Sequence, residues 1–254
     1  MDIRKSKVLR KIRSGKTAYS FKLNLADARA AEIAAMSGID CLWTDMEHVP
    51  NDYYAIENIV RAAKIYDVDV LTRVKRGSYS DLINPLEADS AGVMIPHLMN
   101  LEEAKQVVYY TKFHPIGRRP IDGGNADGNY CLTDANAYIK QANEERFNVV
   151  QIEDPEPLKD LDKICALDGI DMIFFGPADF SQGIGHPNEF DHPELARVKE
   201  LVASTARKHG KMAGTVGGVG NREQLESMGY NFINIGADVV GLAGYYCDIL
   251  SKIK

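Results

Sequence analysis

Short apolar runs recur along the whole chain, separated by longer stretches of mixed polarity. Each run is four to six residues long and is typical of a strand buried on both faces of a sheet. The predicted strands span Ala18–Leu23, Cys41–Asp45, Val70–Val74, Gly92–Pro96, Val149–Ile152, Met172–Phe175, Lys211–Val216 and Phe232–Ile235.

The stretches between these runs have the spacing of amphipathic helices. Eight strands that are each followed by a helix predict a parallel sheet covered on both faces. The eight repeats favour a closed (β/α)8 TIM barrel over an open doubly wound sheet. The chain has 254 residues and no linker-like segment, so one barrel domain over residues 1–254 is expected. The predicted helices span Ala26–Ser37, Tyr53–Tyr66, Ser80–Asp89, Leu101–Thr111, Asn136–Arg146, Leu158–Leu167, Pro193–His209, Arg222–Met228 and Val239–Ile253.

One predicted connection is unusually long. His114–Tyr130 is rich in Gly, Asn and Asp, and loops of this length are uncommon unless they are functional or disordered. It follows a helix, whereas the active site of such a barrel is built from loops that follow strands. The segment would therefore have to wrap around the barrel, or reach a neighbouring subunit, to take part in chemistry.

Charge and composition narrow the class of protein. The net charge is −6 and no strongly basic stretch follows the N-terminus, which argues against a nucleic-acid partner. No apolar run is long enough to cross a membrane, and the basic N-terminus lacks the apolar core of a secretory signal. The four cysteines lack CxxC spacing, which favours free thiols in a reducing cytoplasm over a zinc site.

Two carboxylates follow neighbouring predicted strands. Glu153 comes directly after the run NVVQI, and Asp179 comes shortly after MIFF. Because parallel strands end at the same rim of a barrel, the pair would give a hard divalent cation a two-point anchor. The alternative is that these acids cap the helices that follow them.

Further polar side chains are expected at the same rim. Asp45 and His48 follow the second strand, and an Asp within one turn of a His can accept its Nδ1–H and raise its basicity. Arg73 lies inside an apolar strand, where it is either a structural ion pair or a clamp for a carboxylate. Gln151 points to the same region, and Glu47 is either part of the site or a solvated loop acid.

A glycine-rich segment, Gly217–Gly220, follows the seventh predicted strand. Barrels often bind phosphate after their seventh and eighth strands, but the only basic residue near this segment is Arg222. A glycine-lined pocket for a small polar substrate is the alternative.

Five segments together resemble the HpcH/HpaI family of class II pyruvate aldolases. They occur in the family's order with similar spacing, and the similarity covers nearly the whole chain. Five motifs in register identify the superfamily better than the substrate. The segments are Asp45–Asn51 (DMEHVPN), Thr72–Val74 (TRV), Val93–His97 (VMIPH), Gln151–Glu153 (QIE) and Phe175–Ser181 (FGPADFS).

The resemblance implies a metal-dependent carbon–carbon lyase that cleaves a 4-hydroxy-2-oxo acid to pyruvate, or a related 2-oxo acid, and an aldehyde. By resemblance, Glu153 and Asp179 hold Mg²⁺, Mn²⁺ or Co²⁺, which a 2-oxo acid chelates. Arg73 binds the keto oxygen or the carboxylate. His48, oriented by Asp45, transfers a proton.

The resemblance also assigns residues that line the substrate. Gln151 matches a glutamine of the family's site, and the backbone N–H groups of Ala178 and Asp179 would face the carboxylate. Val216 would touch the aldehyde half. The family assembles as trimers and hexamers with a swapped C-terminal helix, so Val239–Ile253 is expected to have that role in a homo-oligomer.

The residues fit this chemistry independently of the family. A metal ion stabilises the enolate oxyanion as a Lewis acid, and Arg73 adds positive charge. A Schiff-base aldolase would instead need a lysine at a strand end, and Lys75 and Lys211 are poorly placed for it.

The sequence departs from the family pattern in three places. Glu87 stands where many members have an Asp at a subunit contact, and the loop Ile121–Tyr130 and the segment Gly214–Gly218 differ from the usual versions. The two segments would touch the aldehyde half, so the identity of the aldehyde stays open.

Two other functions are considered. A citramalyl- or malyl-type CoA-thioester lyase would use the same enolate, but such relatives usually carry more basic residues for the CoA phosphates. A non-catalytic barrel predicts loss of the site residues, which are all present.

Overall fold

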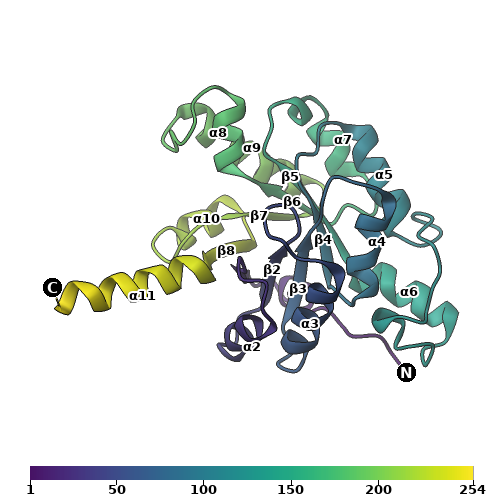
Figure 1. Cartoon of the computed structure of the whole chain (residues 1–254). Coiled ribbons are helices and arrows are strands. Elements are labelled where there is room, and N and C mark those ends of the chain that lie inside the picture. Colours follow the sequence, from purple (N-terminus) through teal and green to yellow (C-terminus); the bar gives the residue numbers. More distant parts are fainter. Residues whose placement is uncertain (254) are drawn as a thin grey trace.

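Eight parallel strands close into a barrel in which each strand pairs with the next and β8 pairs with β1 (Figure 1). The computed structural model describes residues 1–253. The barrel confirms the predicted fold class, and each predicted strand is present with bounds shifted by two residues at most. The strands are β1 Ala18–Lys22, β2 Cys41–Asp45, β3 Asp69–Arg73, β4 Gly92–Ile95, β5 Phe147–Ile152, β6 Met172–Phe175, β7 Met212–Val216 and β8 Phe232–Ala237.

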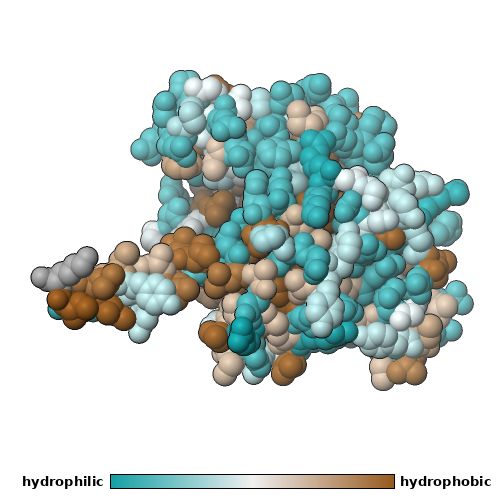
Figure 2. Space-filling model, viewed as in Figure 1, coloured by the Kyte–Doolittle hydropathy of each residue, from teal (hydrophilic) through white to brown (hydrophobic). Residues whose placement is uncertain are grey.

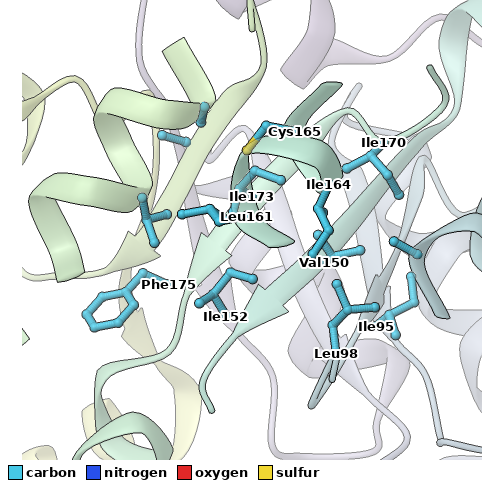
Figure 3. Packing of buried hydrophobic residues seen from close by; sticks show 14 of the residues in the cluster. Ile95, Leu98, Val150, Ile152, Leu161, Ile164, Cys165, Ile170, Ile173 and Phe175 are labelled. Carbon is cyan, nitrogen blue, oxygen red and sulfur yellow. The ribbon is translucent and has the colours of Figure 1, made fainter. Parts of the chain in front are cut away.

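Helices surround the barrel, and their apolar faces pack on the outward side chains of the strands. Figure 3 shows part of this layer, where Ile152 and Phe175 lie among Leu161, Ile164 and Ile173. The main helices are α2 Ala28–Met36, α3 Tyr53–Lys64, α4 Tyr79–Glu87, α5 Leu101–Thr111, α6 Ala135–Glu145, α7 Leu161–Ala166, α9 Pro193–Lys208 and α10 Arg222–Met228, with short 3-10 turns η1 Ala126–Gly128 and η2 Glu156–Asp160.

Two short helices were not predicted. One is α8, Pro177–Gly183, which directly follows β6. The other is α1, Lys7–Arg13, which begins where the Ser6 hydroxyl accepts the N–H of Leu9. Its seven residues are too few for a helix that is stable alone, and it is held by burial of Val8 and Leu9 in the cluster that fills the barrel interior.

The segment that leads into α1 is fixed by the buried carboxylate of Asp69 at the start of β3. Asp69 Oδ1 lies 2.6 Å from Arg4 Nη1, and Oδ2 accepts the Ser6 hydroxyl at 2.6 Å and the Val8 N–H at 2.9 Å. Arg4 also bonds Asp89. The N-terminal residues thus close the end of the barrel opposite the strand C-termini.

The long connection His114–Tyr130 lies near this same closed end, since the Asn129 amide donates to the carbonyl of Asp2. A buried ion pair orders it: Arg119 Nη2 lies 2.7 Å from Asp127 Oδ2, which also accepts the hydroxyl of Tyr138. Its residues lie outside the cavity at the strand C-termini described below.

The last helix, α11 Asp238–Ile253, leaves the body of the protein and projects from it (Figure 1). None of its residues is buried, although many are apolar. Across residues 1–253, no helix has the length and apolar character to cross a membrane.

We expect Asp69→Asn to lower the free energy of unfolding by roughly 3 kcal/mol, because it leaves the largely buried Arg4 and the α1 segment without their main acceptor. Asp67→Asn is the matched control: Asp67 pairs with Arg10 at the surface, and loss of an exposed pair costs about 1 kcal/mol or less. Urea unfolding followed by circular dichroism measures both. Equal effects of the two substitutions would contradict the conclusion that Asp69 holds the N-terminal segment in place.

Candidate active site

A cavity of about 380 Å³ opens at the C-terminal end of the barrel. The size is that of a site for a small molecule. Of the residues that the resemblance assigns to the site, Asp45 alone is outside its lining; it is fully buried beneath the cavity, against Arg73. The lining includes Lys22, Trp43, His48, Arg73, Gln151, Glu153, Gly176, Pro177, Ala178, Asp179, Val216, Gly217, Asn234, Ala237 and Val240.

Glu153 enters the cavity because of the alternation of side chains along a strand. Ile152 points outward into the helix layer (Figure 3), so Glu153 faces the interior, where it is 1% exposed. Its Oε1 accepts the backbone N–H of His97 at 2.7 Å, and its Oε2 accepts the side-chain N–H of Gln151 at 2.9 Å. These two bonds fix the carboxylate toward the cavity.

Gly176 makes room for this carboxylate. A Cβ atom at position 176 would lie 2.7 Å from Glu153 Oε2, closer than real Cβ contacts allow. Pro177 then starts α8, with Asp179 in its first turn. Since β5 and β6 are paired at Ile152 and Phe175, both carboxylates belong to neighbouring strand ends, as the sequence predicts.

The protonation of Glu153 reflects its position. Burial raises the pKa of Glu153 to about 7, and the N–H and ring of His97 oppose this effect only in part. The His97 ring contacts a different carboxylate, since its Nδ1 lies 2.8 Å from Asp154 Oδ2. The protein therefore buries a carboxylate next to Asp179 without supplying a full countercharge.

These features fit a bound divalent cation. Carboxylate oxygens are the ligands that hard cations prefer, and Mg²⁺ is commonly held by one or two carboxylates, with water and substrate in the other positions. The Oε1 of Gln151 is a further buried oxygen without a hydrogen-bond partner in residues 1–253. In the same range no group of three or more His, Cys, Asp or Glu side chains converges, so Glu153 and Asp179 would form an open site.

Arg73 is clamped in place by two carboxylates. Asp45 accepts its Nε at 3.1 Å and also its Nη2, and Glu47 Oε2 lies 3.2 Å from Nη1. Burial opposes ionisation of Asp45, but the hydrogen bonds and charge of Arg73, aided by Lys22, lower the pKa of Asp45 to about 2. Glu47 is thus largely buried against Arg73, next to the cavity, and is not a solvated loop acid.

The prediction that Asp45 accepts a hydrogen bond from the His48 ring is wrong. The Asp45 carboxylate is turned toward Arg73, and it meets His48 only at the backbone N–H, 3.4 Å away. The His48 side chain is 60% exposed, and its Nε2 lies 3.5 Å from Glu47 Oε2. Asp45 therefore shapes the loop that carries His48, and Glu47 is the acid beside the ring.

Lys22 and Trp43 are two cavity residues that the sequence did not reveal. Lys22 ends β1, and its Nζ lies 3.1 Å from Asp45 Oδ2 and 5.1 Å from the Trp43 ring centre. Lys75 and Lys211, the two lysines that the sequence places near strands, lie outside the cavity lining. The available signal was a charged residue at the C-terminal end of the first strand.

His97 and Asn234 were also missed as site residues. His97 adopts a left-handed backbone conformation (φ 47°) that directs its N–H to Glu153. Asn234 is inward-facing on β8 and accepts the hydroxyl of Ser20. An isolated polar residue inside an apolar run was the only sequence signal for Asn234.

The glycine segment after β7 has a packing role in the structure. A Cβ atom at Gly217 would lie 2.5 Å from Leu225 Cδ1, and the N–H of Gly218 is already bonded to Asn221 Oδ1. Arg222 pairs with Glu223. These contacts favour a glycine-lined wall over a phosphate cradle.

We expect Glu153→Gln to stabilise the metal-free protein above pH 7. The pKa of this carboxyl group is raised from 4.5 to about 7 in the folded protein, so the folded state binds the proton more tightly than the unfolded state does. The free energy of unfolding therefore falls as pH rises through that range. The gain should be on the order of 3 kcal/mol above pH 7 and vanish below about pH 4.5. Urea midpoints across this range, with the exposed Glu156→Gln as control, measure it. A pH-independent difference would contradict the buried, uncompensated carboxylate.

Curated relatives match most of the chain. It is 33% identical over 227 residues to the 2-keto-3-deoxy-L-rhamnonate aldolase of Klebsiella pneumoniae, a match that covers 89% of this chain and 85% of the relative. The protein of the same name from Salmonella gallinarum is 33% identical over 230 residues, with 90% and 86% covered.

Solved structures agree with the fold. An HpcH/HpaI aldolase from Desulfitobacterium hafniense superposes with a TM-score of 0.91 at 26% identity, covering 97% of this chain and 96% of that one. A citrate synthase, SbnG, has a TM-score of 0.88 at 23% identity, with 98% and 96% covered, and supports the fold alone. The HpcH/HpaI aldolase/citrate lyase family model matches residues 20–243, and the chain belongs to that family, as its five motifs predicted.

Proposed function

We propose that this protein catalyses the reversible aldol cleavage of a 4-hydroxy-2-oxo acid to pyruvate, or a related 2-oxo acid, and an aldehyde. The prediction of an aldehyde-lyase is confirmed by the aldolase relatives. The observation that carries the proposal is the meeting of Glu153 and Asp179 with Arg73 and His48 in one cavity. The family depends on a divalent metal, and we propose Mg²⁺, Mn²⁺ or Co²⁺ here.

The 2-oxo acid half would lie at the β5–β6 side of the cavity. Glu153 and Asp179 would hold the cation, which when bound supplies Lewis-acid stabilisation to the keto oxygen. Arg73 places positive charge toward the same oxygen or the carboxylate. The N–H groups of Ala178 and Asp179 are in the first turn of α8 and lack intrahelical acceptors, so they can face the carboxylate. Gln151 and Val216 complete the lining.

His48 would transfer the proton. In cleavage, the base removes the proton of the C4 hydroxyl, the C4–O bond becomes the aldehyde carbonyl, and the C3–C4 electron pair passes into the enolate. Protonation at C3 then gives the 2-oxo acid. The exposed ring of His48 lines the cavity beside Glu47 and is accessible to the substrate, while Asp45 keeps Arg73 in position.

Lys22 does not favour a Schiff-base route. An amine that attacks a keto group must be free to approach it, whereas the Lys22 amine is paired with the buried Asp45 carboxylate at 3.1 Å. Removal of metal with EDTA, followed by restoration with Mn²⁺, separates the routes, because a Schiff-base enzyme needs no cation.

We expect Asp179→Ala to abolish metal-dependent pyruvate release, and His48→Ala to slow it by roughly 10²–10⁴-fold while the protein still binds Mn²⁺. Asp191→Ala, an exposed acid in the loop after α8, is the control for a lost charge. Pyruvate is measured with a coupled lactate dehydrogenase assay, and Mn²⁺ binding by calorimetry.

The substrate panel pairs pyruvate or hydroxypyruvate with several aldehydes and each of the three metals, in the direction of addition. Full activity of Asp179→Ala would contradict the assignment of Asp179 as a metal ligand. Absence of product with every aldehyde and every metal in the panel would contradict the proposed aldolase activity.

A homo-oligomer, trimeric or hexameric, is part of the proposal. The exposed face of α11 is apolar (Figure 2), with Val240, Tyr245 and Ile253 at least 60% exposed. Such a surface is rare on a monomer and marks an interaction site. A nearby apolar cavity of about 400 Å³ is lined by Phe21 and Leu23, among others.

We expect the double substitution Leu242→Glu/Ile249→Glu to shift the protein to smaller species in analytical ultracentrifugation, because both apolar side chains lie on the exposed helix. Lys252→Glu changes the charge of the same helix and should leave the assembly intact. A wild-type monomer at micromolar concentration would refute the proposed assembly.

We also infer a cytoplasmic location from cysteine use. The four cysteines are free, and Cys41 and Cys165 are buried in the core. Free thiols are typical of a reducing compartment.

A further inference from the structure

His97 holds Glu153 through its main chain. The backbone N–H of His97 donates to Glu153 Oε1 at 2.7 Å, and the direction of this N–H depends on a left-handed backbone conformation with a φ of 47°. Non-glycine residues rarely adopt this conformation, because the Cβ atom then approaches the following carbonyl oxygen. It persists where surrounding contacts hold it in place. The contacts of the His97 side chain therefore bear on the orientation of Glu153.

The ring of His97 makes one hydrogen bond within residues 1–253. Its Nδ1–H donates to Asp154 Oδ2 at 2.8 Å, since a carboxylate can only accept. The ring nitrogens lie 3.8 Å from Glu153 Oε1 and 3.9 Å from Glu47 Oε1, which is too far for a hydrogen bond. Asp154 directly follows Glu153 in the chain. His97 thus bonds two consecutive residues, Glu153 with its main chain and Asp154 with its ring.

His97 and Asp154 both lie outside the lining of the cavity at the C-terminal end of the barrel. Their side chains are 33% and 23% exposed, so neither belongs to the apolar core, and substitutions there should leave the fold intact. Such a substitution can affect a bound cation in two ways. It can release the Glu153 carboxylate from its orientation, or it can change the charge near the cation.

We propose, building on the proposed metal-dependent function, that the hydrogen bond between the His97 ring and Asp154 holds Glu153 in its cation-binding orientation. The ring ties the loop after β4 to the end of β5, and the His97 N–H then fixes Glu153 Oε1. A carboxylate that is already oriented loses little freedom when a cation binds, so this hydrogen bond raises the affinity. His97 and Asp154 are positioning residues, because they act through Glu153.

The experiment measures Mn²⁺ binding to the metal-free full-length protein by calorimetry. Asp154→Ala removes the acceptor of the ring and should raise the Kd for Mn²⁺ roughly 10- to 100-fold, the range for partners of metal ligands. Asp154→Asn loses the charge but keeps an oxygen acceptor, so its Kd should stay within about threefold of the wild type. Glu156→Ala, which removes a nearby exposed acid, is the control and should leave the Kd unchanged. If Asp154→Asn binds as weakly as Asp154→Ala, charge is responsible and the inference is overturned.

A double substitution tests whether the two side chains act as one unit. His97→Ala removes the ring and the support of the left-handed conformation, so it should weaken Mn²⁺ binding at least as much as Asp154→Ala. In the His97→Ala background, Asp154→Ala should then have no further effect, because its partner is already missing. Independent losses that multiply in the double variant would overturn the inference.

Calorimetry also separates loss of fold from loss of orientation. A partly unfolded preparation lowers the number of Mn²⁺ sites per chain, whereas a displaced Glu153 carboxylate raises the Kd of the sites that remain. A lower number of sites with an unchanged Kd in Asp154→Ala would assign the pair a purely structural role and overturn the inference.

Asp179→Ala distinguishes failure of the inference from failure of the proposed function. If the wild type binds no Mn²⁺, or if Asp179→Ala binds it as tightly as the wild type, the proposed metal site fails and the inference falls with it. If Asp179 is required for binding but Asp154→Ala leaves the Kd unchanged, the inference alone is overturned.

Discussion

Closure of the parallel barrel is the constraint on which the site depends. It brings the ends of all strands to one rim, so that Lys22, Arg73, Glu153 and Asp179 share a cavity although they are far apart in sequence. The barrel interior below them is filled by apolar side chains such as Phe147, and α1 covers its other end. Charges at the rim therefore act in a medium of low effective dielectric constant.

Two buried carboxylates at this rim, Asp45 beneath the cavity and Glu153 in its lining, differ in their partners. Asp45 receives two protein cations, which lower its pKa to about 2. Glu153 receives mainly dipolar partners, and its pKa is raised to about 7. A charge that the protein neutralises internally holds the scaffold together, whereas a charge that it leaves uncompensated is suited to an added cation. Asp45 thus supports the structure of the site, whereas Glu153 is suited to binding a ligand.

The sequence predicted the barrel because each strand is a mostly apolar run, and the fold can be inferred from such runs even when their ends are misplaced by a residue or two. It also predicted that Glu153 and Asp179 lie at this rim, because Glu153 directly follows such a run and Asp179 comes four residues after the end of the next one. It failed where side-chain direction decides the contact, as in the wrong pairing of Asp45 with the His48 ring. Lys22 was missed because it ends an ordinary strand, and α1 because its stability comes from distant packing.

The position of Trp43 has a spectroscopic consequence. It is the single tryptophan of the chain, and its ring lies 5.1 Å from Lys22 Nζ and 5.2 Å from Arg73 Cζ, in the lining of the cavity. Indole emission responds to nearby charge and to solvent access, so the intrinsic fluorescence of the unlabelled protein arises at the site itself. Binding of a ligand in the cavity should therefore change the fluorescence of the protein directly, because no other tryptophan contributes to the signal.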